Sequence, residues 1–266
     1  MMLIIINSLT SLFYNSISLS KPVWNEQVIK STLSFLTSIS FWHSVAPFIL
    51  VLIATLFLIQ INYKFGQGEL WKYIRGKYFN PSEEERIFMF LDIASSTTIA
   101  EKIGHIRFFN FINDFYKDIT DSILRRRGEI VDYVGDEIIV SWQVTEGLNH
   151  SNCVQCVIDI KKKIESLSEK YQKLYGFVPE FRAGLHYGLA TVGEIGKIKK
   201  EITYFGDVMN TTSRIQGLCK ESEYQLILSN DLLKRLPLNN YSIKSLGEVQ
   251  LRGKSLPTKV FGIETA

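Results

Sequence analysis

Hydrophobic residues dominate the N-terminal quarter of the chain and alternate with polar residues in the remainder. Residues 31–63 contain no Asp, Glu, Lys or Arg, and residues 44–61 are almost continuously apolar. A spanning helix needs about 17–25 apolar residues, so we predict one transmembrane helix over about residues 44–62. The run is apolar on every face, which argues against a core helix. Residues 1–19 are apolar but interrupted by Asn and Ser, and we treat them as a second, weaker candidate span.

The remainder of the chain has the hydrophobic periods of a mixed α/β domain. We predict a buried strand at 87–93, one or two helices over 98–127, a hairpin over 129–142, an amphipathic helix over 150–175, a second hairpin over 181–196, a helix over 207–218 and two closing strands over 241–265. This order predicts an α/β fold of the α+β sandwich type. Its core resembles the ferredoxin-like βαββαβ arrangement.

Charge separates the same two regions. Residues 1–63 contain three charged side chains, Lys21, Glu26 and Lys30. The basic flank of Lys64, Lys72, Arg75 and Lys77 predicts a cytoplasmic side after the span. We therefore expect a membrane segment (1–63), a juxtamembrane linker (64–80) and a cytoplasmic domain (81–266) anchored to an inner or plasma membrane. The net charge of +3 is too small to suggest nucleic-acid binding.

Two aspartates stand where strands are predicted to end. Asp92 closes the first buried strand, and Asp136 lies at the tip of the first hairpin. Neighbouring buried carboxylates repel and require compensation, most simply by a cation. Oxygen ligands suit Mg²⁺ or Mn²⁺, and two such ions could bind a triphosphate and activate an attacking oxygen. Ser95, Ser96 and Thr97 follow at a helix N-terminus, whose free N–H groups attract anions.

A third group lies on the predicted helix over 207–218. Asn210 and Arg214 are four residues apart and project from one helix face. Such a pair could orient a ribose and stabilise charge on a transferring phosphate. Taken in isolation, it is more typical of a solvated helix face.

Four motifs in order, FLDIASST, YVGDEIIVSW, RAGLHYGLATVGEIG and YFGDVMNTTSRIQ, resemble the class III nucleotide cyclase catalytic domain, the adenylyl and guanylyl cyclase family. The resemblance covers about residues 86–261. It implies a homodimer with active sites shared between the subunits. It also implies that a ribose 3′-hydroxyl attacks the α-phosphate of ATP or GTP, which releases pyrophosphate.

The resemblance assigns roles to individual residues. One subunit supplies the ligands of two Mg²⁺ or Mn²⁺ ions, here Asp92, Asp136 and the Ile93 carbonyl. The other supplies Asn210 for the ribose and Arg214 for the transition state. The basic triphosphate contact near the C-terminus falls on Arg252.

The positions that select the base depart from the family pattern. Adenylyl cyclases usually have Lys, and guanylyl cyclases Glu, four residues before the second metal aspartate, where this chain has Asp132. The partner position is Thr203, which some bacterial adenylyl cyclases also carry. An ionised Asp132 can only accept hydrogen bonds, which matches guanine's donors or adenine's N6 alone. We expect ATP slightly ahead of GTP.

Two further readings remain open. The run YVGDEIIV shares part of the GGDEF signature of diguanylate cyclases, but Val134 replaces its first Gly. The second alternative is a catalytically degenerate cyclase domain with a regulatory role, and Asp132 is the residue that supports it. The intact aspartates and the Asn–Arg pair argue against it.

Overall fold

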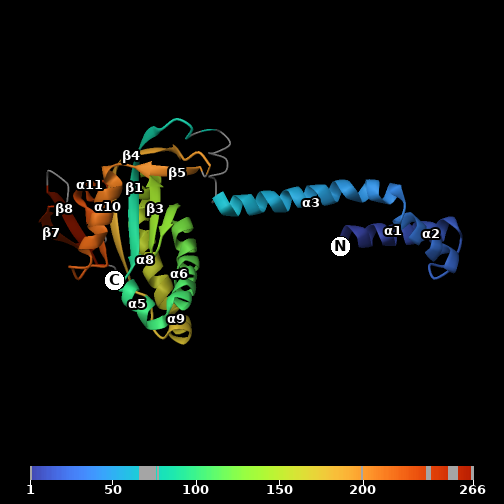
Figure 1. Cartoon of the computed structure of the whole chain (residues 1–266), viewed down its shortest axis with the longest axis horizontal. Coiled ribbons are helices and arrows are strands. Elements are labelled where there is room, and N and C mark those ends of the chain that lie inside the picture. Colours follow the sequence, from blue (N-terminus) through green and yellow to red (C-terminus); the bar gives the residue numbers. More distant parts are fainter. Residues whose placement is uncertain are drawn as a thin grey trace. The chain divides into compact units, whose positions relative to one another are not determined.

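The structure is a computed structural model that describes residues 2–65, 76, 78–198, 200–237, 241–250 and 257–264. The chain forms two units, residues 1–75 and 76–266. Figure 1 labels their elements. Most of the predicted linker 64–80, and the predicted phosphate contact Arg252, lie outside the described residues.

The N-terminal unit consists of helices α1 (Met2–Ser18), α2 (Glu26–Leu36) and α3 (Ile39–Phe65). The Asn25 side chain caps α2 by accepting a hydrogen bond from the Gln27 N–H, and the Asn15 amide joins α1 to α2 by a 3.2 Å hydrogen bond to Thr32 Oγ1. Over Ile39–Ile61, α3 is long and apolar enough to cross a membrane, by length and composition, and it is almost wholly exposed. That helix contains the span predicted over 44–62, whereas a spanning role for α1 stays a prediction.

The second unit is built on one sheet with the strand order β2-β3-β1-β4-β6-β8-β7, and β5 pairs with β4. The strands are β1 (Ser82–Ile93), β2 (Glu129–Val134), β3 (Glu137–Gln143), β4 (Phe181–Ile195), β5 (Glu201–Phe205), β6 (Leu226–Ser229), β7 (Ile243–Val249) and β8 (Thr258–Ile263). Strand β1 is antiparallel to both β3 and β4, and β2 is antiparallel to β3. The order β2-β3-β1-β4 confirms the predicted ferredoxin-like core.

Helices cover both faces of this sheet. They are α5 (Ser96–Ile103), α6 (His105–Arg125), α7 (Val144–Leu148), α8 (Asn152–Ser166), α9 (Ser168–Tyr175), α10 (Asp207–Leu218) and α11 (Asn230–Leu233), with a 3₁₀ turn at Asn149–Ser151. The odd-numbered residues of β1, such as Met89 and Leu91, pack in the large core with residues of α6 and α8. The even-numbered Phe88 and Phe90 pack with Val208 of α10 on the opposite face. Figure 1 shows α10 on the other side of the sheet from α6. We call this opposite side the α10 face.

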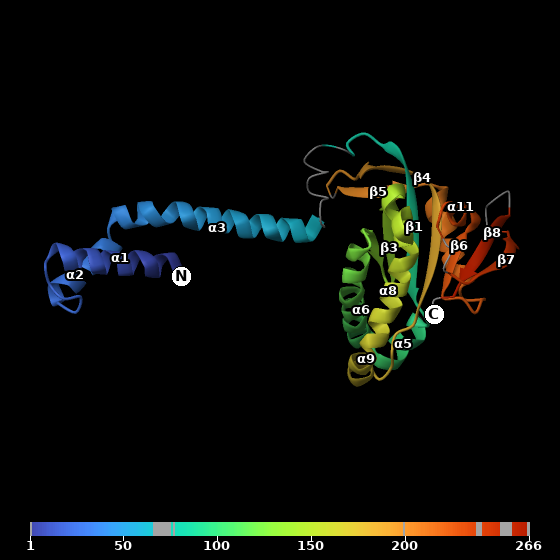
Figure 2. The same cartoon turned by 180° about the vertical axis from the view of Figure 1, so that it is seen from behind.

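Two sequence predictions of element boundaries are wrong. Residues 181–196 were expected to form a hairpin, but β4 is one long strand whose far end carries β5 (Figure 2). Its glycines serve close packing instead of turns, because a Cβ on Gly184 would lie 2.4 Å from the Gln216 backbone nitrogen. The helix expected over 150–175 is divided into α8 and α9 at Leu167.

Several other predictions are confirmed. The helix over 207–218 has the predicted bounds, and the hairpin over 129–142 forms around Gly135. The segment 98–127 is two helices, which meet at Gly104 with φ +82°. Strand β6 and helix α11 were not predicted.

We expect Gly184→Ala to destabilise the second unit by about 1–3 kcal/mol, because the added methyl group overpacks the contact between β4 and α10. Urea unfolding of residues 76–266 measures this change. Gly217→Ala in α10 is the matched control, since its Cβ would meet nothing within 4 Å and alanine is the better helix former. Equal stability of the two variants would contradict the proposed close packing.

Candidate active site

The end of β1 and the β2–β3 turn bring two aspartates together. Gly135, with φ +66°, allows the tight turn that places Asp136 beside the last residues of β1. The Ile93 N–H donates to the Asp136 carbonyl at 3.4 Å. Burial raises the pKa of Asp92 to about 6, and the Asp136 carboxyl adds to this rise through a hydrogen bond and its charge. Asp92 and Asp136 therefore lie side by side, since Asp92 pairs with Glu137, the residue after Asp136.

A third acidic residue belongs to this cluster and was missed in the sequence. Glu137 lies directly opposite Asp92 in the β1–β3 register, so both side chains project from the same face. Burial, and then the charges of Asp92 and Asp136, raise the pKa of Glu137 to about 7. The sequence places Glu137 next to Asp136, but only the strand register shows that it faces Asp92.

Two polar side chains partly compensate Asp92. The Gln216 amide of α10 donates to Asp92 Oδ2 at 3.4 Å. The ammonium of Lys220, just beyond α10, lies 4.0 Å from the same oxygen and is mostly exposed. Both lower the pKa of Asp92, but burial and Asp136 outweigh them.

The chemistry of this donor set fits a hard divalent cation. The exposed Lys220 ammonium only partly compensates these adjacent carboxyl groups, and Mg²⁺ and Mn²⁺ prefer such oxygen ligands. Within the described part of the chain, no group of three or more His, Cys, Asp and Glu side chains has the arrangement of a complete metal site. A cation held by Asp92 and Asp136 therefore needs further oxygen donors, as Mg²⁺ usually takes from water and phosphates.

Helix α10 carries the predicted Asn210 and Arg214. It buries Val208, Thr212 and Ile215 against the sheet, which leaves Asn210 exposed and Arg214 half-buried. Neither side chain forms a hydrogen bond or ion pair with any residue that the structure describes. In a single chain, the structure therefore does not connect them to the two aspartates.

Arg182 is a second residue that sequence reasoning missed. It lies opposite Asp92 in the β1–β4 register and is half-buried, with no hydrogen bond or ion pair among the described side chains. The Arg182 guanidinium projects from the same face of the sheet as Asp92. It would suit a phosphate.

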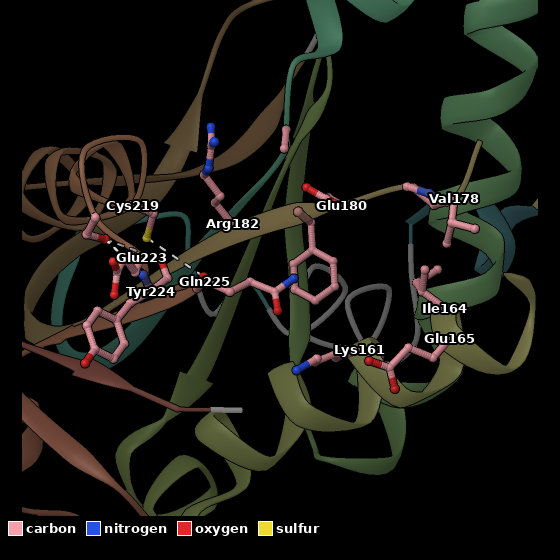
Figure 3. Close-up of a pocket in the computed structure, with 14 residues that line it drawn as sticks. Lys161, Ile164, Glu165, Val178, Glu180, Arg182, Cys219, Glu223, Tyr224 and Gln225 are labelled. Carbon is pink, nitrogen blue, oxygen red and sulfur yellow. Dashed lines mark hydrogen bonds between the residues drawn. The ribbon is translucent and has the colours of Figure 1, made fainter. Parts of the chain in front are cut away.

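Arg182 also lines a cavity of about 460 Å³ next to the end of β1. Figure 3 shows Arg182 between Cys219 and Glu180, with Lys161 and Glu165 of α8 across the cavity. The lining contains both acidic and basic side chains, so its charge does not favour one class of ligand.

The remaining predicted residues occupy separate places. Asp132 is exposed on β2, and Thr203 is half-buried on β5 opposite Gly193. Ser95 precedes α5 with φ +58°, and its side chain does not cap the helix with a hydrogen bond. Ser96 and Thr97 begin α5.

Comparisons with known proteins agree on one family. A family model described as the adenylate and guanylate cyclase catalytic domain matches residues 80–264. Adenylate cyclase 2 of Rhizobium meliloti is 37% identical over 209 residues, which are 78% of this chain and 58% of that protein. The receptor-type guanylate cyclase gcy-13 of Caenorhabditis elegans is 27% identical over 188 residues, 68% of this chain and 18% of that protein.

A bacterial light-regulated adenylyl cyclase has a similar structure, with a TM-score of 0.69 and 20% sequence identity. The match covers 84% of this chain and 66% of that one. This likeness concerns the fold. The chain spans less than two thirds of the length of either curated relative.

The acidic cluster predicts that stability depends on pH when divalent metal is absent. Asp92 and Glu137 have raised pKa values of about 6 and about 7, so the folded state binds more protons than the unfolded state between about pH 4 and 7, and stability falls as pH rises. We expect the Tm of residues 76–266 in EDTA to fall by about 5 °C from pH 5 to pH 8. The double variant Asp92→Asn with Glu137→Gln should flatten this slope. An unchanged slope in that variant would show that other groups are responsible.

Proposed function

Because the chain belongs to the adenylate and guanylate cyclase catalytic domain family, we propose that it is a class III nucleotide cyclase that converts ATP to 3′,5′-cyclic AMP and pyrophosphate. GTP is the alternative substrate. The observation that carries this proposal is the position of Asp92 and Asp136 side by side at the end of β1, where the Ile93 N–H donates to the Asp136 carbonyl and Asp92 pairs with Glu137. The 37% identity to a protein named adenylate cyclase supports ATP.

The acidic end of β1 is the proposed metal site. Asp92, Asp136 and the Ile93 carbonyl would hold Mg²⁺ or Mn²⁺, two ions per site. When bound, the ions would neutralise phosphate charge and increase the acidity of the attacking hydroxyl. The raised pKa of Asp92 supports this assignment, because a buried carboxylate that Lys220 only partly compensates gains from a bound cation.

The other chemical groups act on the nucleotide. Asn210 orients the ribose, and the Arg214 guanidinium stabilises negative charge on the α-phosphate. Arg182 and the N–H groups at Ser95–Thr97 bind the outer phosphates, with Arg252 as a further contact. A bond forms between the ribose 3′-oxygen and the α-phosphorus, the bond to the β-phosphate oxygen breaks, and the hydroxyl proton leaves to solvent.

We propose that two copies of the chain share each site. Asn210 and Arg214 have no hydrogen bond or ion pair to Asp92 or Asp136 in one chain, although each side chain is accessible. A symmetric homodimer presents the same surfaces to each other. One copy then supplies the carboxylates, and its partner supplies Asn210 and Arg214.

Asp132 and Thr203 are the proposed base contacts. Asp132 is exposed and accepts a hydrogen bond from the following Tyr133 N–H at 2.8 Å, which leaves acceptor capacity for a base. Adenine can donate through N6, and Thr203 can donate to N1. This arrangement accepts ATP, and the acidic Asp132 also keeps GTP open as a substrate.

The N-terminal unit is the proposed anchor. Helix α3 has the length and composition to span a membrane over Ile39–Ile61. The basic residues that follow favour a cytoplasmic catalytic unit, which would place cyclic-nucleotide signalling at an inner or plasma membrane.

Shared sites predict complementation between two inactive variants. Asp92→Asn removes a metal ligand and Arg214→Ala removes transition-state stabilisation, so each should lower kcat about 100-fold or more. A mixed dimer of the two contains one intact site, so an equal mixture should recover about a quarter of wild-type activity.

Cyclic-nucleotide production after mixing the purified variants measures this recovery. Asp92→Asn mixed with Asp136→Asn is the control, because both changes affect the same half of the site and should not complement. Full activity of either single variant would contradict the proposed mechanism.

A further inference from the structure

Arg86 is a fully buried arginine on the α10 face of the sheet. Its side chain lies on the same face of β1 as Phe88 and Phe90. Arg86 pairs with Gly188 of β4, which has no side chain to compete for space. Its Nη2 is buried and has no hydrogen-bond partner among the described residues. Burying a charge that is not fully paired costs free energy. The hydrogen bonds of the other nitrogens therefore indicate which parts of the sheet the guanidinium stabilises.

One nitrogen, Nη1, contacts strand β2, and the other contacts of the guanidinium are to β3 and to β1 itself. Nη1 lies 2.7 Å from Glu129 Oε2 and 3.0 Å from Ser141 Oγ. Nε lies 3.0 Å from Glu84 Oε2. Glu129 is the first residue of β2, so Arg86 fixes the start of β2 across the intervening strand β3.

A bulge in β2 connects this anchor to Asp132. Glu129 pairs with Ser141 and Asp132 pairs with Ile139, with a register shift between Ile130 and Asp132. Because Ser141 and Ile139 are two residues apart on β3, they project from the same face. The extra residue in β2 therefore places Glu129 and Asp132 on one face, the face that Arg86 occupies.

The guanidinium also holds β5. Its Cζ lies 5.1 Å from the centre of the Tyr204 ring, within the range of a cation–π contact. The same ring packs edge-on against Phe88 at 5.5 Å. Tyr204 directly follows Thr203, so this contact determines where the backbone of Thr203 lies over the sheet.

We propose that Arg86 is a positioning residue for base selection: by holding Glu129 on β2 and Tyr204 on β5, it fixes the separation of Asp132 and Thr203. This inference rests on the proposed function, in which these two residues contact the base. Arg86 itself is buried and does not touch the substrate.

The planar guanidinium is required because it contacts Glu84, Glu129 and the Tyr204 ring in different directions. A lysine ammonium keeps the charge but cannot keep this arrangement. Arg86→Lys should therefore alter the spacing of the two base contacts while leaving Asp92, Asp136, Asn210 and Arg214 in place. The effect should appear in the KM values and in the choice between ATP and GTP, and only weakly in kcat.

The test compares kcat and KM for ATP and for GTP in the full-length chain with Mn²⁺. For Arg86→Lys we expect the ratio of the two kcat/KM values to change about tenfold through KM, with kcat within about threefold. The matched control is Arg126→Lys. Arg126 forms a 2.7 Å ion pair with Asp159 of α8, a helix that packs on the opposite face of the sheet from Arg86, and its replacement should leave the ratio unchanged.

Glu129→Gln and Tyr204→Leu each remove one anchor and decide the question if Arg86→Lys does not fold. Each should shift the ratio by about threefold. Equal loss of kcat/KM for both nucleotides in the three variants would overturn the positioning role but leave the proposed function standing. A wild-type chain that makes no cyclic nucleotide would overturn the proposed function and this inference together.

Discussion

The antiparallel pairing of β1 between β3 and β4 is the constraint on which the rest of the catalytic unit depends. Residues 86–91 of β1 are buried, with one set of side chains in the large core and the other on the α10 face. A slip of one residue would exchange the two sets and is therefore strongly disfavoured. This fixed register places Asp92 opposite Glu137 on one side and Arg182 on the other.

The same register brings negatively charged groups together, which is electrostatically unfavourable. Three carboxyl groups gather at one end of β1, and the pKa values of Asp92 and Glu137 rise because burial and the neighbouring carboxyl charges disfavour the charged forms. Such sites are often functional, because a bound cation relieves the repulsion. At the other end of the α10 face, Arg86 is the buried positive charge, surrounded by acceptors and an aromatic ring. One strand thus positions both the proposed metal ligands and, through its neighbours, the proposed base contacts.

The sequence was sufficient where the signal is local. The short apolar run at 87–93, the Gly135-Asp136 turn and the helical period of 207–218 predict β1, the first hairpin and α10, and hence the meeting of Asp92 and Asp136. The sequence does not predict the features that depend on contacts between residues far apart in the chain. The glycines of β4 suggest turns, whereas the structure shows α10 packed on Gly184. The roles of Glu137, Arg182 and Arg86 can be inferred only from the strand register, which shows the residues that they face. Arg252, predicted from the family resemblance, lies outside the described residues.

The most direct test of the account is cyclic-nucleotide production by the purified chain, given ATP and GTP separately with Mn²⁺ or Mg²⁺. The account predicts a 3′,5′-cyclic nucleotide that is lost when the metal is chelated, with cyclic AMP the favoured product. Cyclic GMP would show that Asp132 dictates the base. Absence of product from either nucleotide, in a folded dimer, would contradict the account and favour a regulatory domain that has lost catalysis.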